Sequence, residues 1–319
     1  MTRPNSTIAE FFSFLASPKE FFNKQNAQKP YQRLFFVLKL VSFGLLFGII
    51  INYFSSYVSS LVGFNQTDNN IVSRDLKAFP AFIGLLLVTV IGPLLEELAF
   101  RLYLTTQRTY FFFGLNFFVY YIWEFIGGIF NLKDSFLFNS PGIFFIIVAI
   151  FGFTTTCSLI VSTKWLESIV TRFFNQFVYS AGIIFGLIHI TNYENYQKYF
   201  YLIPILVLPQ IFVSFIFAFV RTKFSFWWSF ISHTLYNFAL ASPMFALAIF
   251  VGNDRSQEIE DILSNRNLGD RIAAINPTEK IIVSGVDWFV LIMYLILFLI
   301  LIYSVFELFI GYKKTSKPR

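Results

Sequence analysis

The stretch GPLLEELAFRLYL, residues 92 to 104, places two glutamates and an arginine inside an otherwise apolar run. Its apolar residues are typical of a membrane-spanning helix, because about 20 of them cross the hydrocarbon of a bilayer. A charged side chain at the centre of such a helix costs about 2.5 to 3.5 kcal/mol on insertion scales. Glu96, Glu97 and Arg101 therefore need partners or a function inside the membrane.

The composition of the whole chain also indicates a membrane protein. Only 13% of the 319 residues are charged and 56% are hydrophobic, whereas about a quarter of the residues in soluble proteins are charged. The single cysteine, Cys157, argues against a disulfide framework and a cysteine-based metal cluster. The net charge of +6 lies mostly at the two ends, which indicates membrane topology and not a nucleic-acid surface. We therefore expect an all-α, polytopic membrane protein whose surroundings are the lipid bilayer.

Eight apolar segments are long enough to cross the membrane. Basic residues follow the second, fourth and sixth of them on the side of both basic termini, so the positive-inside rule predicts an N-in, C-in topology. The hydrophilic segment 252 to 280 then lies on the opposite side, and residues 258 to 268 within it suit a short amphipathic helix. The predicted spans are roughly residues 34 to 57, 79 to 104, 110 to 131, 142 to 163, 172 to 191, 199 to 220, 224 to 251 and 286 to 310.

The predicted domain organisation is simple. Residues 1 to 33 lack the pattern of a cleavable signal peptide and suit an amphipathic helix on the membrane surface. Residues 34 to 311 form one membrane domain, and residues 312 to 319 form a basic cytoplasmic tail. We find no internal repeat, low-complexity tract or second soluble domain in the sequence.

The three charges of the opening stretch are not equivalent. Glu97 and Arg101 are four residues apart with the acid first, a spacing that lets a helical pair meet on one face. Glu96 lies about 100° around the helix and is left without that partner. A desolvated carboxylate without a cation suits a residue that accepts and returns a proton. The alternative interpretation, a structural ion pair with a spare acid, is disfavoured because acids within membrane spans are functional by default.

Both histidines of the chain fall in predicted spans. His189 follows Phe185 by four residues, and His233 precedes Asn237 by four. An isolated buried histidine is more often a packing residue than a catalyst. Two histidines, an amide and a glutamate without a cation together supply a base, a proton carrier and an amide donor. Such a set can activate water and hold an oxyanion, which amide hydrolysis requires.

Three motifs on three separate predicted helices, taken in order, carry a family resemblance. They are Glu-Glu-x-x-x-Arg at 96 to 101, Phe-x-x-x-His at 185 to 189 and His-x-x-x-Asn at 233 to 237. They resemble the motifs of the CAAX protease and bacteriocin-processing (CPBP or Abi) family, the intramembrane glutamic endopeptidases that include the Ras converting enzyme. The resemblance covers the second to the seventh predicted span and implies an eight-helix bundle with an intramembrane catalytic cavity.

The resemblance also implies roles for individual residues. Glu96 with His189 would activate the attacking water, and His233 with Asn237 would stabilise the tetrahedral oxyanion. The reaction would need no metal or other cofactor, and the substrate would be a peptide or a membrane-anchored protein. Three supporting residues are implied as well: Glu97 and Arg101, which would hold their helix in place, and Phe185, which would pack beside His189.

The sequence departs from the family pattern in two places. Leu102 follows the arginine where many members have a glycine, so the residue that usually permits a close helix approach is missing. The long gap between the first two motifs holds two predicted spans, which preserve the topology and bring in Glu124, interpreted as a capped or interfacial acid. His189 also lies near the end of its span, so a kink at Pro93 or a tilted helix would be needed to bring it level with Glu96.

Other functions are compatible with the same residues. One glutamate and two histidines can hold Zn²⁺, but these histidines lie 44 positions apart and no His-Glu-x-x-His helix is present. Buried acids and histidines also form proton relays in transporters, which the lack of internal repeats disfavours. A third alternative is a catalytically lapsed scaffold or immunity protein. The residues do not select a substrate, although the composition favours an inner-membrane protein of an AT-rich bacterium and disfavours prenylated substrates.

Overall fold

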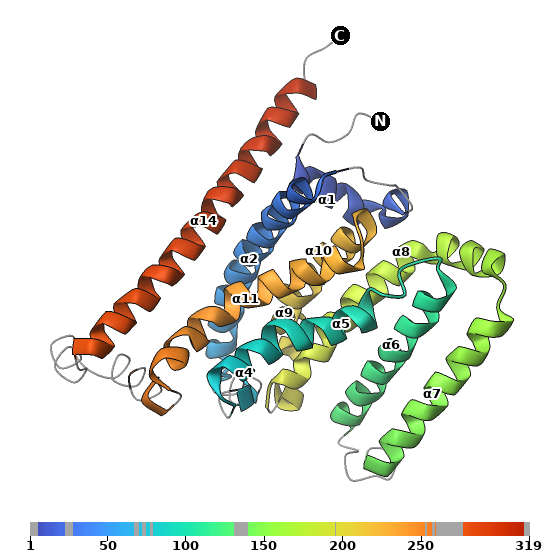
Figure 1. The fold of residues 1–319 in the computed structure, drawn as a ribbon, viewed down its shortest axis with the longest axis horizontal. Coiled ribbons are helices and arrows are strands. Elements are labelled where there is room, and N and C mark those ends of the chain that lie inside the picture. The colour runs from blue at the N-terminus through green and yellow to red at the C-terminus, as the bar shows by residue number, and fades with distance from the viewer. Residues whose placement is uncertain are drawn as a thin grey trace.

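The structure is a computed structural model in which helices account for nearly all regular structure (Figure 1). It describes residues 6–22, 28–66, 70–71, 75–76, 79–130, 140–194, 196–252, 254–256, 259 and 277–315. Within these residues the only β-type pairing is an isolated antiparallel bridge between Asn70 and Tyr193. The predicted all-α class is therefore confirmed.

Eight helical segments correspond to the eight predicted spans. Within the described residues, six helices could cross a membrane by length and hydropathy, or eight if each of two bent pairs is one span. The bends are 45° between α9 and α10 and 59° within α11, next to Pro243. The long helices are α2 (Pro30–Leu61), α6 (Arg108–Ile129), α7 (Ser140–Ile160), α8 (Thr163–Ile188), α10 (Leu208–Lys223), α11 (Phe226–Val251) and α14 (Pro277–Thr315), and the shorter elements are α1 (Thr7–Ala16), η1 (Pro18–Phe21), α4 (Ala81–Leu86), η2 (Leu87–Ile91), α5 (Gly92–Phe100), η4 (His189–Asn192), η5 (Tyr196–Leu202) and α9 (Ile203–Leu206).

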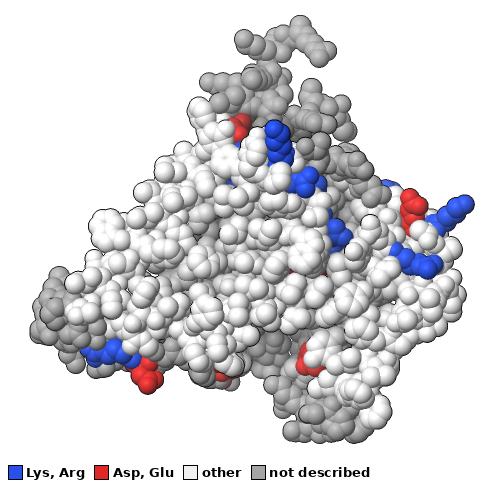
Figure 2. Space-filling view, viewed as in Figure 1, with Lys and Arg blue, Asp and Glu red and all other residues white. Residues whose placement is uncertain are grey.

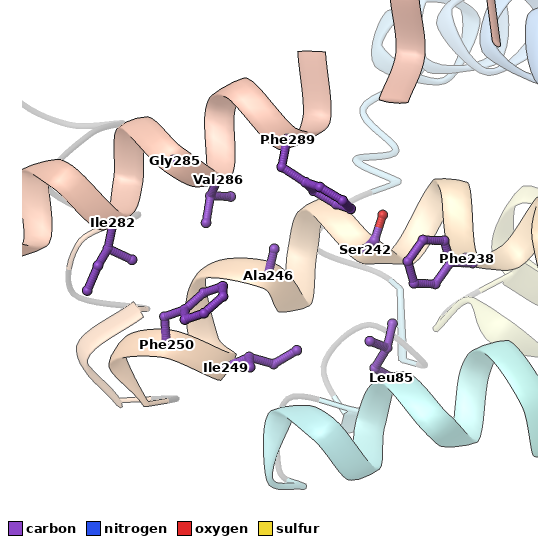
Figure 3. A pocket seen from close by; sticks show the side chains of 10 residues that line it. All are labelled: Leu85, Phe238, Ser242, Ala246, Ile249, Phe250, Ile282, Gly285, Val286 and Phe289. Atoms are coloured by element: carbon purple, nitrogen blue, oxygen red, sulfur yellow. The ribbon is translucent and has the colours of Figure 1, made fainter. Parts of the chain in front are cut away.

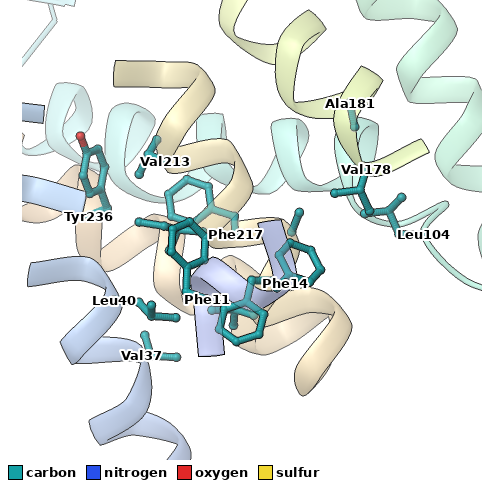
Figure 4. Packing of buried hydrophobic residues seen from close by; sticks show 14 of the residues in the cluster. Phe11, Phe14, Val37, Leu40, Leu104, Val178, Ala181, Val213, Phe217 and Tyr236 are labelled. Carbon is teal, nitrogen blue, oxygen red and sulfur yellow. The ribbon is translucent and has the colours of Figure 1, made fainter. Parts of the chain in front are cut away.

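Helix α10 lies at the centre of the bundle and packs against α2, α8 and α11. Its side chains Phe217 and Val213 join a buried cluster with Leu40 of α2 and Val178 of α8 (Figure 4). By contrast, helices α7 and α14 are mostly exposed. Within an apolar stretch of 18 residues, 6% of α7 and 11% of α14 are buried, against 44% of α2. Helices α7 and α14 also lie at opposite edges of the fold (Figure 1). The surface in Figure 2 has a broad uncharged area between the charged residues at its upper right and those along its lower edge, as a bilayer requires.

The N-terminal helix packs on the bundle. Its N-cap residue Ser6 accepts a hydrogen bond from the backbone of Ala9 at 3.2 Å. Phe11 and Phe14 are fully buried, with ring centroids 5.8 and 5.0 Å from that of Phe219 on α10. The amphipathic helix predicted for residues 1 to 33 is thus present as α1. The buried part of its aromatic face contacts protein, and the neighbouring Phe12 is 50% exposed.

A glycine on α6 provides a close helix approach at Leu102, the position where the family pattern has a glycine. A Cβ atom at Gly114 would lie 2.6 Å from the backbone nitrogen of Tyr103 and 3.0 Å from Cβ of Leu102. The small residue is therefore on the facing helix, and the chain after α5 passes close to α6 with leucine in place. The α6–α7 pair that fills the long gap between motifs packs on α5 through α6.

Three further expectations concern the periphery. Glu124 is exposed on α6 and accepts a hydrogen bond from the Tyr120 hydroxyl one turn earlier. The predicted amphipathic stretch 258 to 268 lies outside the described residues apart from Ile259. Helix α14 continues to Thr315, so the first residues of the predicted basic tail extend the last helix.

Candidate active site

The helix that carries the two glutamates begins with an irregular turn. The π-helical turn η2 ends at Ile91, and the backbone N–H of Gly92 bonds to the carbonyl of Leu87, five residues earlier. In the same five-residue register, the carbonyl of Val88 would bond to the backbone N–H of residue 93. That residue is Pro93, and proline has no backbone N–H. The side chain of Asn237 donates from Nδ2 to the Val88 carbonyl at 2.9 Å. An amide of α11 thus replaces the missing helical bond beside Pro93, where a kink was expected.

Glu97 is fully buried and makes three polar contacts. Its Oε1 lies 3.1 Å from Nδ1 of His233 and 3.5 Å from Nε of Arg101. Its Oε2 lies 2.5 Å from the hydroxyl of Ser229. The ion pair of Glu97 and Arg101 therefore forms one turn apart, as the spacing predicts, and supplies the partners that a buried charge requires.

Glu96 faces the same imidazole from the other side. Its Oε2 lies 3.4 Å from Nε2 of His233, and 23% of its side chain is exposed, against none for Glu97. His233 therefore lies between two carboxylates, one enclosed and one more accessible. Glu96 thus contacts an imidazole, while the ion pair with Arg101 is made by Glu97.

Aromatic rings hold the imidazole of His233 in place. The ring of Phe217, from α10, stacks on it with centroids 4.3 Å apart and planes 23° apart. The ring of Phe185, from α8, contacts it edge-on at 5.9 Å. Since the side chain of His233 is only 3% exposed, its ring has little freedom to turn.

Arg101 is enclosed by the same two rings. Its guanidinium carbon lies 4.4 Å from the centroid of Phe185 and 5.5 Å from that of Phe217, at cation–π distance. Its Nη2 donates to the hydroxyl of Ser214 at 2.7 Å, and its backbone carbonyl accepts from Nε of Arg221 at 3.0 Å. Among the described residues, Nη1 of Arg101 has no hydrogen-bond partner.

His189 occupies the end of α8, next to Phe185. Its Nδ1 lies 2.7 Å from the carbonyl of Phe185, and the two rings are 4.6 Å apart. Because a carbonyl only accepts, Nδ1 carries the hydrogen, and Nε2 of the neutral ring holds a lone pair. No ion pair or hydrogen bond joins His189 to Glu96 in the described structure, so the imidazole in contact with Glu96 is that of His233 and not that of His189.

The structure adds residues to the site that the motifs do not include. Ser229 lies four residues before His233, so it extends the His-x-x-x-Asn face of α11 by one turn, and this spacing could have indicated it. The contributions of α10 had no such pattern in the sequence. They are Ser214, Phe217 and Arg221.

An apolar groove of about 500 Å³ lies between elements of the same bundle (Figure 3). It is formed by the second half of α11, by α14 and by Leu85 of α4. Phe238, which follows Asn237, and Ser242 line it from α11, and the hydroxyl of Ser242 is the polar side-chain group in the lining. No ionisable side chain of the described residues lines this groove, so it is chemically unlike the cluster of Glu96, Glu97, Arg101 and His233.

The donors needed for a metal site were also considered. Among the described residues, no group of three or more His, Cys, Asp or Glu side chains is arranged to hold a metal ion. The two carboxylates and the imidazole of the cluster are instead arranged in a line, with His233 in the middle.

A scan against protein-family models finds no match, and searches of curated proteins and of solved structures find none either. The fold and the site define the class of this protein: an integral, multi-pass helical membrane protein with a buried cluster of two glutamates, an arginine and a histidine.

Proposed function

We propose that the protein is an intramembrane endopeptidase of the CPBP type, a hydrolase that cuts a peptide bond with water activated by a glutamate. The observation that carries this proposal is the line of Glu97, His233 and Glu96, with 3.1 and 3.4 Å between successive partners, inside an apolar bundle. Intramembrane ionisable groups mark functional sites by default. A carboxylate in contact with an imidazole is a pair that can take up and return a proton.

In the proposed reaction Glu96 takes one proton from a water molecule. The water oxygen bonds to the carbonyl carbon of the substrate, and the carbonyl oxygen becomes an oxyanion. The carbon–nitrogen bond then breaks, and the proton held by Glu96 and His233 passes to the leaving nitrogen. The products are a carboxylic acid and an amine, and the site returns to its starting protonation state.

Two groups support the proposed water and oxyanion positions. The lone pair on Nε2 of His189 follows from its Nδ1 contact to the Phe185 carbonyl, and it can accept a hydrogen bond from the attacking water. The amide of Asn237 has two N–H groups and donates to the Val88 carbonyl, so one N–H is left for the oxyanion. His233 is the second oxyanion donor when Nε2 is protonated.

The proposed substrate is a peptide or a membrane-anchored protein within the bilayer. The groove formed by α4, α11 and α14 is apolar, which suits a substrate segment that already lies in lipid. The proposed location is the inner membrane of a bacterium with both termini in the cytoplasm, as the basic ends and loops indicate.

The test compares membrane and secreted peptides from cells that carry the wild-type protein, Glu96→Gln or Glu124→Gln. Glu124→Gln is a matched control, since it neutralises an exposed glutamate of α6 whose described hydrogen bond is to Tyr120 and not to the cluster. We expect precursors to accumulate with Glu96→Gln and the wild-type pattern with Glu124→Gln. Identical peptide patterns in all three strains, with proton flux lost from Glu96→Gln vesicles, would identify a transporter instead.

The metal dependence of the proposed cleavage is tested separately, with the purified protein. The proposed glutamate mechanism predicts that cleavage by the purified protein continues in the presence of a strong chelator. Loss of cleavage with the chelator, and its recovery on adding Zn²⁺, would replace the glutamate mechanism with a zinc mechanism.

A further inference from the structure

We propose that Glu97 is a positioning residue for His233: with Ser229 it holds the hydrogen on Nδ1, so that Nε2 becomes the nitrogen that exchanges a proton with Glu96. The role of this exchange in catalysis rests on the proposed function. The geometry of the three side chains is independent of it.

Both oxygens of the Glu97 carboxylate are held. Oε1 lies 3.1 Å from Nδ1 of His233 and 3.5 Å from Nε of Arg101, and Oε2 lies 2.5 Å from the Ser229 hydroxyl. The Ser229 oxygen is also 2.9 Å from the carbonyl of Phe217. A hydroxyl has one proton to give, and an ionised carboxylate is the stronger acceptor. Ser229 therefore donates to Glu97 and keeps the carboxylate from rotating.

The orientation of Glu97 determines the tautomer of His233. An ionised carboxylate is an acceptor only, so Nδ1 of the imidazole must carry a hydrogen. The neutral ring then has its lone pair on Nε2, which faces Oε2 of Glu96 at 3.4 Å. Stacking of the Phe217 ring at 4.3 Å prevents the imidazole from exchanging its two nitrogens by a flip.

This arrangement assigns different tasks to the two adjacent glutamates. A proton that Glu96 takes from water can move to Nε2, which leaves Glu96 as a carboxylate and His233 as an imidazolium. The charge of that imidazolium is stabilised by Glu97, as the buried aspartate stabilises the histidine of a serine-protease triad. The proton returns through Glu96 to the leaving nitrogen, so the number of protons in the site is unchanged.

The chain is well suited to a direct test, because it has only two histidines. Nitrogen-15 NMR of protein labelled at histidine and purified in detergent reports which nitrogen of each imidazole carries the hydrogen. A His189→Gln variant assigns the two sets of signals. For the wild-type protein we expect a hydrogen on Nδ1 and an unprotonated Nε2 in the neutral ring of His233.

Three variants test the cause of that tautomer. Glu97→Met removes the acceptor at nearly constant shape, and we expect a several-fold rise in the Nε2–H tautomer of His233. Ser229→Ala frees one carboxylate oxygen, and we expect a smaller rise in the same direction. Ser232→Ala is the matched control: Ser232 is a fully buried serine of the same helix whose hydroxyl has no partner among the described residues. Its spectrum should equal that of the wild-type protein.

His189 provides a control for folding within each spectrum, because its Nδ1 is held by the Phe185 carbonyl at the end of α8, whereas His233 lies on α11. If Glu97→Met keeps the wild-type tautomer of His233 while the His189 signals are unchanged, the proposal is wrong. If Glu97→Met loses the His189 signals, Ser229→Ala decides, and a spectrum equal to that of Ser232→Ala overturns the proposal. No substrate is needed, so continued cleavage by Glu96→Gln would refute the peptidase proposal alone.

Discussion

Arg101 carries a positive charge into the centre of the bundle. It is 1% exposed, and its guanidinium lies between the rings of Phe185 and Phe217, with Glu97 and Ser214 as polar partners. Removing one partner of a buried ion pair is far more damaging than removing both, because the remaining charge stays desolvated. The pair should therefore be tested as a unit.

We expect Arg101→Met to lower the free energy of unfolding by about 3 to 5 kcal/mol, because it leaves Glu97 without a cation. The double variant Arg101→Met with Glu97→Gln should recover much of that loss, since no buried charge then lacks a partner. The measurement is a denaturation series in mixed detergent micelles for both single variants and the double variant. A single Arg101→Met variant as stable as the wild-type protein would show that the pair is solvated.

At the residue scale the sequence predicted contacts within one helix better than contacts between helices. The spacing of Glu97 and Arg101 within one helix was enough to predict their pairing, because helical geometry is local. The partner of Glu96 could not be predicted in the same way. Its contact with His233 depends on how α5 and α11 pack against each other, and helix packing is not encoded in a spacing along the chain.

The turn before α5 shows how one helix depends on another. Asn237 of α11 donates to the Val88 carbonyl, which Pro93 leaves without a backbone partner. A buried carbonyl that loses its hydrogen bond costs about 1 to 3 kcal/mol. In the structure, Asn237 therefore supports the entry into α5 whether or not it also contacts an oxyanion.

We expect Asn237→Ala to lower stability by about 1 to 3 kcal/mol. Combining it with Pro93→Ala should restore part of this loss, because alanine supplies a backbone N–H that can reach the Val88 carbonyl. Thermal unfolding of the two single variants and the double variant in detergent measures the effect. If Asn237→Ala leaves the unfolding temperature unchanged, or if Pro93→Ala gives no recovery, the hydrogen bond does not support the turn.

At the scale of elements the predicted spans overlap all eight helical segments, because apolar runs bounded by polar or basic residues determine where membrane helices begin and end. The irregular parts were harder to predict. Pro93 indicated an irregular helix turn. The π-helical register of that turn is accompanied by a hydrogen bond from Asn237 of α11, which the sequence did not indicate. The importance of α10 was also missed, since an apolar span gives no indication that Ser214 or Phe217 will face a charge.

For the molecule as a whole, the N-terminal segment is the clearest case in which the sequence pattern predicted an element and not its surroundings. An aromatic face on a short helix suits a membrane surface and a protein core equally well. In the structure this face packs on α10, where Phe11 and Phe14 meet Phe219. Helix α1 therefore supports the helix that stacks Phe217 on His233.

Two adjacent phenylalanines of α1 test whether the aromatic face of this helix packs in the protein core or lies on lipid. Phe11 is fully buried and Phe12 is 50% exposed. We expect Phe11→Ala to lower the free energy of unfolding by about 3 to 5 kcal/mol, because it leaves a cavity in the packed core, and Phe12→Ala to have a much smaller effect. The stability of both variants in detergent is the measurement, and binding of a synthetic α1 peptide to lipid vesicles is a control for membrane affinity. Equal losses of stability for the two variants would contradict the packing of α1 on α10, because a helix lying on lipid would use both rings for the same purpose.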